Sequence, residues 1–411
     1  MSYVVQRFLA ALLITLMAPA AGLAADRGVS VPDRARPAYD PLGITAGAFT
    51  IFPEVTVGTE YNDNIYATRS NKESDWIFTV APRIRAGSDW SNHAVNMDAG
   101  IKSGFYASES DENYVDGHLL ANGRLDISRD SSLSARAGIR RLHEDRGEPD
   151  VDRQAFSWDE PGIYYRTIAG LDFYQAFGRF GATLGGGYTN LDYKSVDLID
   201  GTSQDRDIQD REIYTVTGRL QYDMHPDVKP FITTRYEWRD YDQSEAERDS
   251  EGYRIGVGTG FDLGGITSGE VYGGYMKQDY DDRSNISGFW FGLSKLWNAT
   301  PITSVEAFAE TSVKETTLQD SSGIRSFDLG LRADHELRRN VLIGAAANYT
   351  LNDYRGADLT EDYYAVGPSL TYLWNRNLSA EIGYRYRTKD SDIRDREYSE
   401  NRFTVAITGS L

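Results

Sequence analysis

The chain has 411 residues, no cysteine and a formal net charge of −19, because 62 Asp and Glu residues outnumber 43 Lys and Arg residues. The absence of cysteine excludes a disulfide scaffold and the processing of a lipoprotein. Beyond residue 25 there is no run of about 18 apolar residues, which excludes a transmembrane helix in that part of the sequence.

Residues 1–25 predict a cleaved secretory signal. Arg7 supplies a positive charge, "FLAALLITLMAPA" is a short apolar stretch, and "AGLAA" offers small residues for cleavage after Ala24 or Ala25. A membrane-anchoring helix is the alternative, but the apolar run is short and Pro19 interrupts it. Residues 26–51 contain several prolines and no periodicity, so we expect an irregular periplasmic segment.

From residue 52 to residue 411 apolar and polar residues alternate with period two, which predicts half-buried strands in one domain. We expect about 18 strands, within a range of about 16–18. The expected spans are 52–61, 76–88, 93–107, 113–127, 133–143, 163–177, 180–193, 212–224, 231–241, 251–263, 267–280, 287–297, 303–314, 326–337, 341–354, 363–374, 378–389 and 398–411.

The connections between these strands alternate between two kinds. Short polar turns such as "SRDSS", "LRRN" and "WNRN" alternate with longer acidic segments at 62–75, 108–112, 144–162, 194–211, 242–250, 281–286, 315–325, 355–362 and 390–397. Tight periplasmic turns and long outer loops are typical of an antiparallel, up-and-down β-barrel in the outer membrane. An even number of strands returns both chain ends to the periplasm. The sequence therefore predicts an all-β transmembrane barrel located in the cell outer membrane.

The two faces of the expected strands differ in a way that fits such a barrel. In 76–86, Trp76, Phe78 and Ile84 share one face, while Arg83 and Arg85 share the other. A small dry core cannot accept so many charges, whereas a wide barrel encloses a water-filled lumen and turns its apolar face to lipid. We expect inward Tyr106 and Tyr174 to offer stacking faces for sugars. The expected lumen-lining residues are Arg83, Arg85, Arg136, Arg140, Arg219, Arg235, Arg239, Arg332, Arg385, Arg387, Asp328 and Glu381.

Aromatic residues cluster near the expected strand ends, as in the girdles at the two edges of a membrane. The alternative is ordinary aromatic pairing between strands of a soluble β-protein. The tryptophans concerned are Trp76, Trp90, Trp158, Trp238, Trp290, Trp297 and Trp374. Outer-membrane barrels commonly end in a strand with alternating apolar residues and a terminal aromatic residue, which serves as a signal for the barrel assembly machinery. The final strand here keeps the apolar alternation but ends in Leu411.

The first strand, "FPEVTVGTEYNDNIYAT" (52–68), and the repeated "WNRN" and "LRRN" turns carry a family resemblance. With 52–411 in view, the chain resembles a family of outer-membrane β-barrel porins whose members are often encoded beside exopolysaccharide or capsular polysaccharide synthesis genes. The resemblance implies an outer-membrane location and a role in polysaccharide export.

No pattern in the sequence indicates catalysis. His118 and His335 are expected on lumen faces, and only His143, beside Glu144 and Asp145, is expected near the outer leaflet, where an outer-membrane enzyme acts. The acidic loops lack the spacing of a twelve-residue calcium loop. We therefore expect no enzymatic activity, no catalytic residue, no metal site and no cofactor.

The longest connection, 144–162, occupies the place where a loop folds into the barrel of general porins, an analogy of position alone. Folded inward, it would form a constriction opposite the lumen arginines and create a transverse field. The alternative is a surface loop, with arginine–carboxylate pairs that stiffen the wall. The acids concerned are Glu144, Asp145, Glu148, Asp150, Asp152, Asp159 and Glu160.

The sequence favours a porin-like channel for hydrophilic solutes, with exopolysaccharide export as one form of that function. A structural or adhesive barrel, with acidic loops that bind a ligand or calcium, is the alternative. Expected partners are outer-membrane lipid and lipopolysaccharide, the barrel assembly machinery, and a polysaccharide or small polar solute; nucleic acid is not expected. The identity of the solute, the direction of transport and the oligomeric state stay open.

Overall fold

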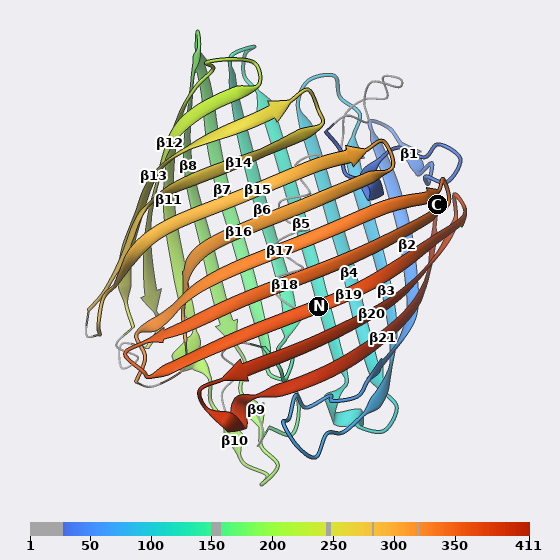
Figure 1. The fold of residues 1–411 in the computed structure, drawn as a ribbon, viewed down its shortest axis with the longest axis vertical. Coiled ribbons are helices and arrows are strands. Elements are labelled where there is room, and N and C mark those ends of the chain that lie inside the picture. Colours follow the sequence, from blue (N-terminus) through green and yellow to red (C-terminus); the bar gives the residue numbers. More distant parts are fainter. Residues whose placement is uncertain (1–27, 149–157, 244–247, 282, 317, 319) are drawn as a thin grey trace.

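The computed structural model describes residues 28–148, 158–243, 248–281, 283–316, 318 and 320–411. Eighteen long antiparallel strands follow one another around a closed wall (Figure 1). The first, β2 (Phe49–Asn62), pairs with the last, β21 (Tyr398–Ser410), which closes the barrel. Closure gives each strand a neighbour on both sides, so backbone groups in lipid are satisfied by pairing. No helix among the described residues is long and apolar enough to span a membrane.

Between β2 and β21 each strand pairs with the next one along the chain. The sixteen intervening strands are β3 (Asp75–Ser88), β4 (Ala94–Tyr106), β5 (Tyr114–Asp126), β6 (Ser131–His143), β7 (Ile163–Phe177), β8 (Phe180–Tyr193), β11 (Arg211–Tyr222), β12 (Val228–Tyr241), β13 (Ser250–Leu263), β14 (Thr267–Tyr280), β15 (Ile286–Thr300), β16 (Thr303–Lys314), β17 (Gly323–Arg338), β18 (Val341–Arg355), β19 (Leu359–Asn375) and β20 (Leu378–Ser391).

The all-β barrel and its eighteen strands confirm the prediction from the period-two pattern. Several strand boundaries differ from the expected spans, and two of these differences have a clear cause. Strand β2 begins at Phe49 rather than at residue 52, because β1 (Ile44–Ala46) forms a small hairpin with its first residues. The predicted long connection 355–362 is only 356–358, because Leu359 and Glu361 continue β19 with buried side chains. The acidic residues at 359–362 therefore belong to strand β19 and not to a loop.

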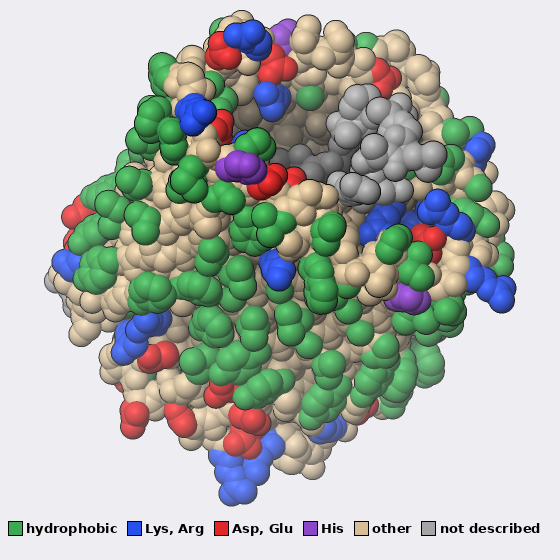
Figure 2. Space-filling model, turned by 45° about the horizontal axis from the view of Figure 1, so that its top comes forward, with side chains coloured by type: hydrophobic (Ala, Val, Ile, Leu, Met, Phe, Trp, Pro, Cys, Tyr) green, Lys and Arg blue, Asp and Glu red, His purple; other side chains and the backbone are tan. Residues whose placement is uncertain are grey.

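The outward face of the wall is apolar. Val57, Phe78 and Ile382 are each more than half exposed, whereas the charged residues of alternate positions point to the other side. Figure 2 shows hydrophobic side chains spread over the outer wall and a hollow in one end of the molecule. The burial pattern is thus inverted relative to a water-soluble protein, as a lipid-facing barrel requires.

The two ends of the barrel are unlike each other. At the long-loop end lie the hairpin of β9 (Val196–Asp197) and β10 (Ser203–Gln204) and the 3₁₀ turns η2 (Ser110–Glu112), η4 (Asp207–Gln209) and η6 (Arg394–Arg396). At the short-turn end lie η1 (Val31–Asp33), β1 and the C-terminal Leu411 (Figure 1). Residues 28–43, here called the N-terminal strap, contact the inner rim of this short-turn end.

The prediction that the tryptophans belong to aromatic girdles is wrong for two of the seven. Trp76, Trp90, Trp297 and Trp374 are 45–50% exposed and Trp238 shares the outward face of Tyr236. Trp290, in contrast, lies inside the barrel in an apolar cluster with Met276, Tyr280, Ile286 and Val313. Trp158 is buried against Val196 in the folded long loops. Even-numbered residues of β15, such as Ile286 and Trp290, point into the barrel. The position of a tryptophan near a strand end does not show which face of the strand it occupies.

Candidate functional site

The inner face of the barrel is lined by arginine–carboxylate pairs, most of them within one strand or between neighbouring strands. Arg83 on β3 binds Asp98 on β4 through two bonds of 2.6 and 2.8 Å and contacts Glu54 on β2 at 3.4 Å. His118 Nε2 lies 3.0 Å from the same Asp98. Residues that face each other across paired strands share one side of the sheet, so these charges all face the lumen.

Most of the predicted lumen arginines have acidic partners. The pairs are Arg85–Glu54, Arg136–Asp172, Arg219–Glu270, Arg235–Glu237, Arg239–Glu237 and Arg332–Asp334, at 2.5–3.1 Å between nitrogen and oxygen. Asp328 pairs with Lys314 at 3.1 Å and accepts a hydrogen bond from Thr350. Arg140 and Arg166 face each other in the β6–β7 register, and Glu381 is exposed on β20. Except for Arg219 and Glu270, which lie on β11 and β14 with two strands between them, these acid–base pairs join residues of one strand or of neighbouring strands.

One contact reaches past several strands. Asp145, just after β6, accepts hydrogen bonds from Arg402 on β21 at 2.9 Å and from Arg387 on β20 at 3.3 Å. Strands β2, β3, β4 and β5 lie between β6 and β21 in the wall. Next to it, the Tyr398 hydroxyl donates to the Gly147 carbonyl at 2.8 Å. The first part of the long connection therefore turns into the barrel and is tied to the β20–β21 wall.

The tie to β20–β21 is electrostatic. Burial alone would raise the pKa of the Asp145 carboxyl, but the guanidiniums of Arg402 and Arg387 hold that pKa well below its usual range. Asp145 is therefore ionised at neutral pH. Its two oxygens contact different arginines, which fixes the segment in place more firmly than a single pair would.

Among the described acids of this connection, Glu144, Asp159 and Glu160 are not paired with the predicted lumen arginines. Glu144 binds Arg206 of the neighbouring long loop at 2.5 and 3.0 Å, and Asp159 and Glu160 are exposed. The Glu148 amide donates to the Asp145 carbonyl at 2.9 Å, which keeps the turn tight. Asp150 and Asp152 lie outside the described residues.

Sequence reasoning missed the residues that hold Asp145 in place. Glu400 on β21 is fully buried, with Oε1 lying 2.6 Å from Arg387 Nε and 2.7 Å from Arg402 Nε. Arg402 also reaches Glu60 on β2 at 3.4 Å. A signal was present, because Glu400 and Arg402 occupy alternate positions on the polar face of the last strand. The same period links Glu237 to Arg235 and Arg239.

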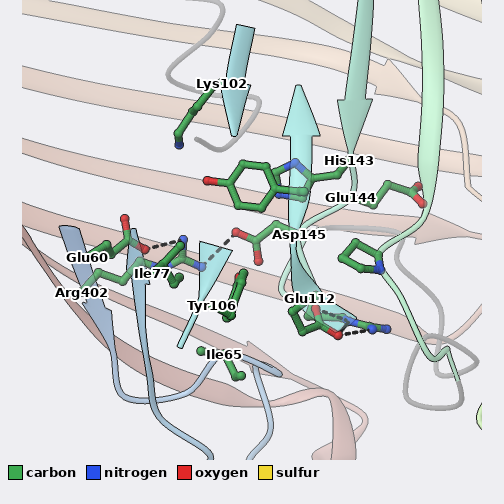
Figure 3. A pocket seen from close by; sticks show the side chains of 13 residues that line it. Glu60, Ile65, Ile77, Lys102, Tyr106, Glu112, His143, Glu144, Asp145 and Arg402 are labelled. Carbon is green, nitrogen blue, oxygen red and sulfur yellow. Dashed lines mark hydrogen bonds and ion pairs between the residues drawn. The ribbon is translucent and has the colours of Figure 1, made fainter. Parts of the chain in front are cut away.

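Figure 3 shows the small pocket beside this contact, at the long-loop end of the lumen. Glu60 and Arg402 come from the barrel's closing strands, Tyr106 and Lys102 from β4, and Asp145 from the inturned segment. The pocket thus combines charges of both signs with phenol rings. Its remaining lining residues are Ile65, Ile77, Glu112, Tyr114, His143, Glu144, Arg146 and Pro161.

A second long-loop residue crosses to a distant strand. Glu315, directly after β16, pairs with Arg239 on β12 and accepts a hydrogen bond from the Tyr241 hydroxyl at 2.8 Å. Apolar side chains at this end pack beside such ties: Leu318 lies against Ile324 and Tyr354. Folded loops therefore cover part of the long-loop mouth.

The histidines of the strands lie on different faces of the barrel wall. His143 Nδ1 lies 2.9 Å from Asp116 Oδ1, and its ring stacks on Tyr114 at 3.9 Å, so it is held in place by packing and by an acid. The expectation for His335 is wrong: it faces outward beside Thr303, because Leu331 and Leu337 set the outward parity of β17. Among the described residues no group of three His, Asp or Glu side chains is arranged to hold a metal ion.

Comparison with known families decides the identity. A family model described as "Putative beta-barrel porin 2" matches residues 36–410. The chain belongs to this family. As a beta-barrel porin 2 protein it is a porin-like barrel of the outer membrane, and membership favours a channel without catalytic activity.

The chain is also similar to solved structures at low sequence identity. OpdL of Pseudomonas aeruginosa is 14% identical, with a TM-score of 0.44 and coverage of 89% of this chain and 100% of that one. OccAB3 of Acinetobacter baumannii is 11% identical, with a TM-score of 0.47 and coverage of 89% and 100%. The siderophore receptor PirA of P. aeruginosa is 12% identical, with a TM-score of 0.44 and coverage of 88% and 80%. A search of curated protein sequences finds no match.

Proposed function

We propose that this protein is a passive channel for hydrophilic solutes across the outer membrane. In this proposal a cleaved signal peptide directs the chain to the periplasm, from which it inserts into the outer membrane. The observation that carries the proposal is the pairing of a charged inner face with an apolar outer face on a closed wall. An eighteen-stranded barrel is wide enough to enclose a water-filled lumen. By the usual orientation of such barrels, the short turns face the periplasm.

Asp145 and the residues that follow it form the proposed constriction. The segment 145–148 lies inside the barrel, so it occupies part of the cross-section that a solute would use. Charges of both signs surround it, which favours polar solutes over apolar ones. Tyr106 lines the adjoining pocket and is the ring that we propose stacks on sugars.

Liposome swelling tests this function. Vesicles containing the purified protein should swell in isosmotic solutions of small neutral sugars, at a rate that falls as the sugar lengthens. Deleting 146–160 should raise the rate, because the inturned segment is removed. Unchanged rates after deletion would contradict the constriction, and no swelling with any solute would contradict the channel.

Polysaccharide export is the finer form of this proposal and needs its own test. Deleting the gene in the host and measuring polysaccharide at the cell surface and in the periplasm separates export from uptake. Accumulation in the periplasm supports export. Normal surface polysaccharide, together with slower growth on a particular solute, supports uptake.

The covering of the long-loop mouth favours a second candidate, a structural or adhesive barrel. Trp158 and Val196 pack together there, and Arg206 stacks over Trp158 at 4.6 Å, so two long loops form one folded surface. Calcium-dependent binding of cells or matrix to this surface, without solute passage, would favour that candidate over the channel.

A further inference from the structure

The N-terminal strap, residues 28–43, is bound inside the short-turn end of the barrel. The Val31 amide donates to the Ser304 hydroxyl on β16 at 2.8 Å, and both residues are fully buried. Sequence patterns predict only an irregular segment here. The contacts instead show a peptide packed on the lumen side of the wall.

Two arginines tie the strap to β15, to the β15–β16 turn and to β17. Arg34 donates to Asn298 Oδ1 on β15 at 2.6 Å and to the Pro301 carbonyl in the β15–β16 turn. Arg36 pairs with Glu336 on β17 at 3.0 Å, with side chains only 3% and 9% exposed. Removing one partner of such a buried, charge-assisted bond costs free energy of folding, because the other charge is left buried without its partner.

The strap has a defined shape of its own. The Arg36 guanidinium donates to the carbonyls of Val31 at 2.6 Å, Arg34 at 3.0 Å and Pro32 at 3.1 Å, which folds the peptide around that side chain. The Arg36 amide donates to Asp40 at 2.5 Å. Prolines at 32, 37 and 41 restrict the backbone further. The segment therefore behaves as one unit rather than as a loose tail.

From these contacts the strap runs along the rim toward the start of the barrel. Arg376, in the turn after β19, donates to the Pro37 carbonyl at 2.8 Å, and the Gly43 amide donates to Leu411 at 3.2 Å. In Figure 1 the dark-blue start of the described chain lies close to β1, at the end of the barrel where the C-terminus is marked. The strap thus passes the turn ends of β15 to β21 before β2 begins.

We propose that the strap is a latched gate at the short-turn mouth, which narrows the entrance and widens it when the contacts of Arg34 and Arg36 release. The proposal rests on the proposed channel function, because it concerns the size of the same passage. It places a second narrowing at the end opposite to Asp145. The latch is the Arg36–Glu336 pair together with the Arg34 contacts, and the hinge is the hairpin of β1 with β2.

The absence of native cysteine allows a direct test with a disulfide. The substitutions V31C and S304C, at positions joined by the 2.8 Å bond from the Val31 amide to the Ser304 hydroxyl, should form a disulfide that locks the strap. This pair is combined with R34Q and R36Q, which weaken the latch. Single-channel conductance of each full-length protein is measured before and after reduction in the same bilayer.

The reduced quadruple variant should conduct about twofold more than the wild type, because the mouth is wider, and oxidation should return it to the wild-type value. A Cys pair without the latch substitutions should conduct like the wild type in both states. Failure of the disulfide to form would contradict the placement of the strap. Equal conductance of the reduced and oxidised quadruple variant, while deletion of 146–160 still raises conductance, would overturn the gate but leave the channel. No current from any protein, including the wild type, would overturn the channel function itself.

Discussion

Asp145, in the connection after β6, is bound by Arg402 of β21 at 2.9 Å, although four strands of the wall separate β6 from β21. This contact pulls the start of the longest connection into the barrel. It converts a sequence of acidic loop residues into an element inside the passage. The size of the proposed constriction therefore depends on one carboxylate.

Asp145→Asn should raise the single-channel conductance. Asn cannot neutralise Arg387 and Arg402, so the inturned segment loses its electrostatic tie and spends part of its time away from the wall. We expect an increase of about 1.5-fold or more and greater current noise. Asp159→Asn is the matched control, because Asp159 is an exposed acid of the same connection. An equal effect of both substitutions would mean that net charge, not the tie, controls conductance.

Acid should have the same effect as Asp145→Asn, in a defined pH range. The folded pKa of Asp145 lies below that of an unfolded carboxyl, which is about 3.9. The tie is therefore fully present above about pH 4 and is lost as the pH falls through the lower folded value. Conductance should be constant from about pH 7 to 4 and rise below that, and the rise should be absent in Asp145→Asn. A rise in conductance between about pH 7 and about pH 4 would contradict the assignment of the effect to Asp145.

Glu400→Gln should lower the free energy of unfolding by about 3 kcal/mol, because this buried carboxylate faces both Arg387 and Arg402. Glu60→Gln should cost about 1 kcal/mol or less, since its pair with Arg402 is longer and more exposed. Urea unfolding of the protein in lipid vesicles measures both. Similar values for the two variants would show that burial of the pair does not determine its contribution.

The orientation of β21 can be tested with one pair of arginine substitutions. Val405 faces outward, so Val405→Arg should cost about 2–4 kcal/mol near the middle of the membrane. Thr404 faces the lumen directly opposite Glu60, so Thr404→Arg should be tolerated and should change conductance instead. Yield of heat-modifiable, folded barrel on gels compares the two. Equal loss of folded protein would contradict the assignment of faces.

The sequence predicted the barrel well because period-two alternation is a local property of each strand. The eighteen spans and the inward parity of Arg83, Arg219 and Arg387 follow from it directly. Contacts between distant parts of the chain carry no such local signal. The tie from Asp145 to Arg402 joins positions 257 residues apart, and the bond from Val31 to Ser304 joins positions 273 apart. Proline-rich residues of the strap have no periodicity, so only their packing reveals where they bind.

The most direct test of the central claim, that the closed wall encloses a path for hydrophilic solutes, is the single-channel conductance of the purified wild-type protein in a planar bilayer. We predict discrete, stable current steps in simple salt, whose size increases when residues 146–160 are deleted. Folded, membrane-inserted protein that gives no current steps, with and without that deletion, would contradict the channel and favour the structural or adhesive barrel.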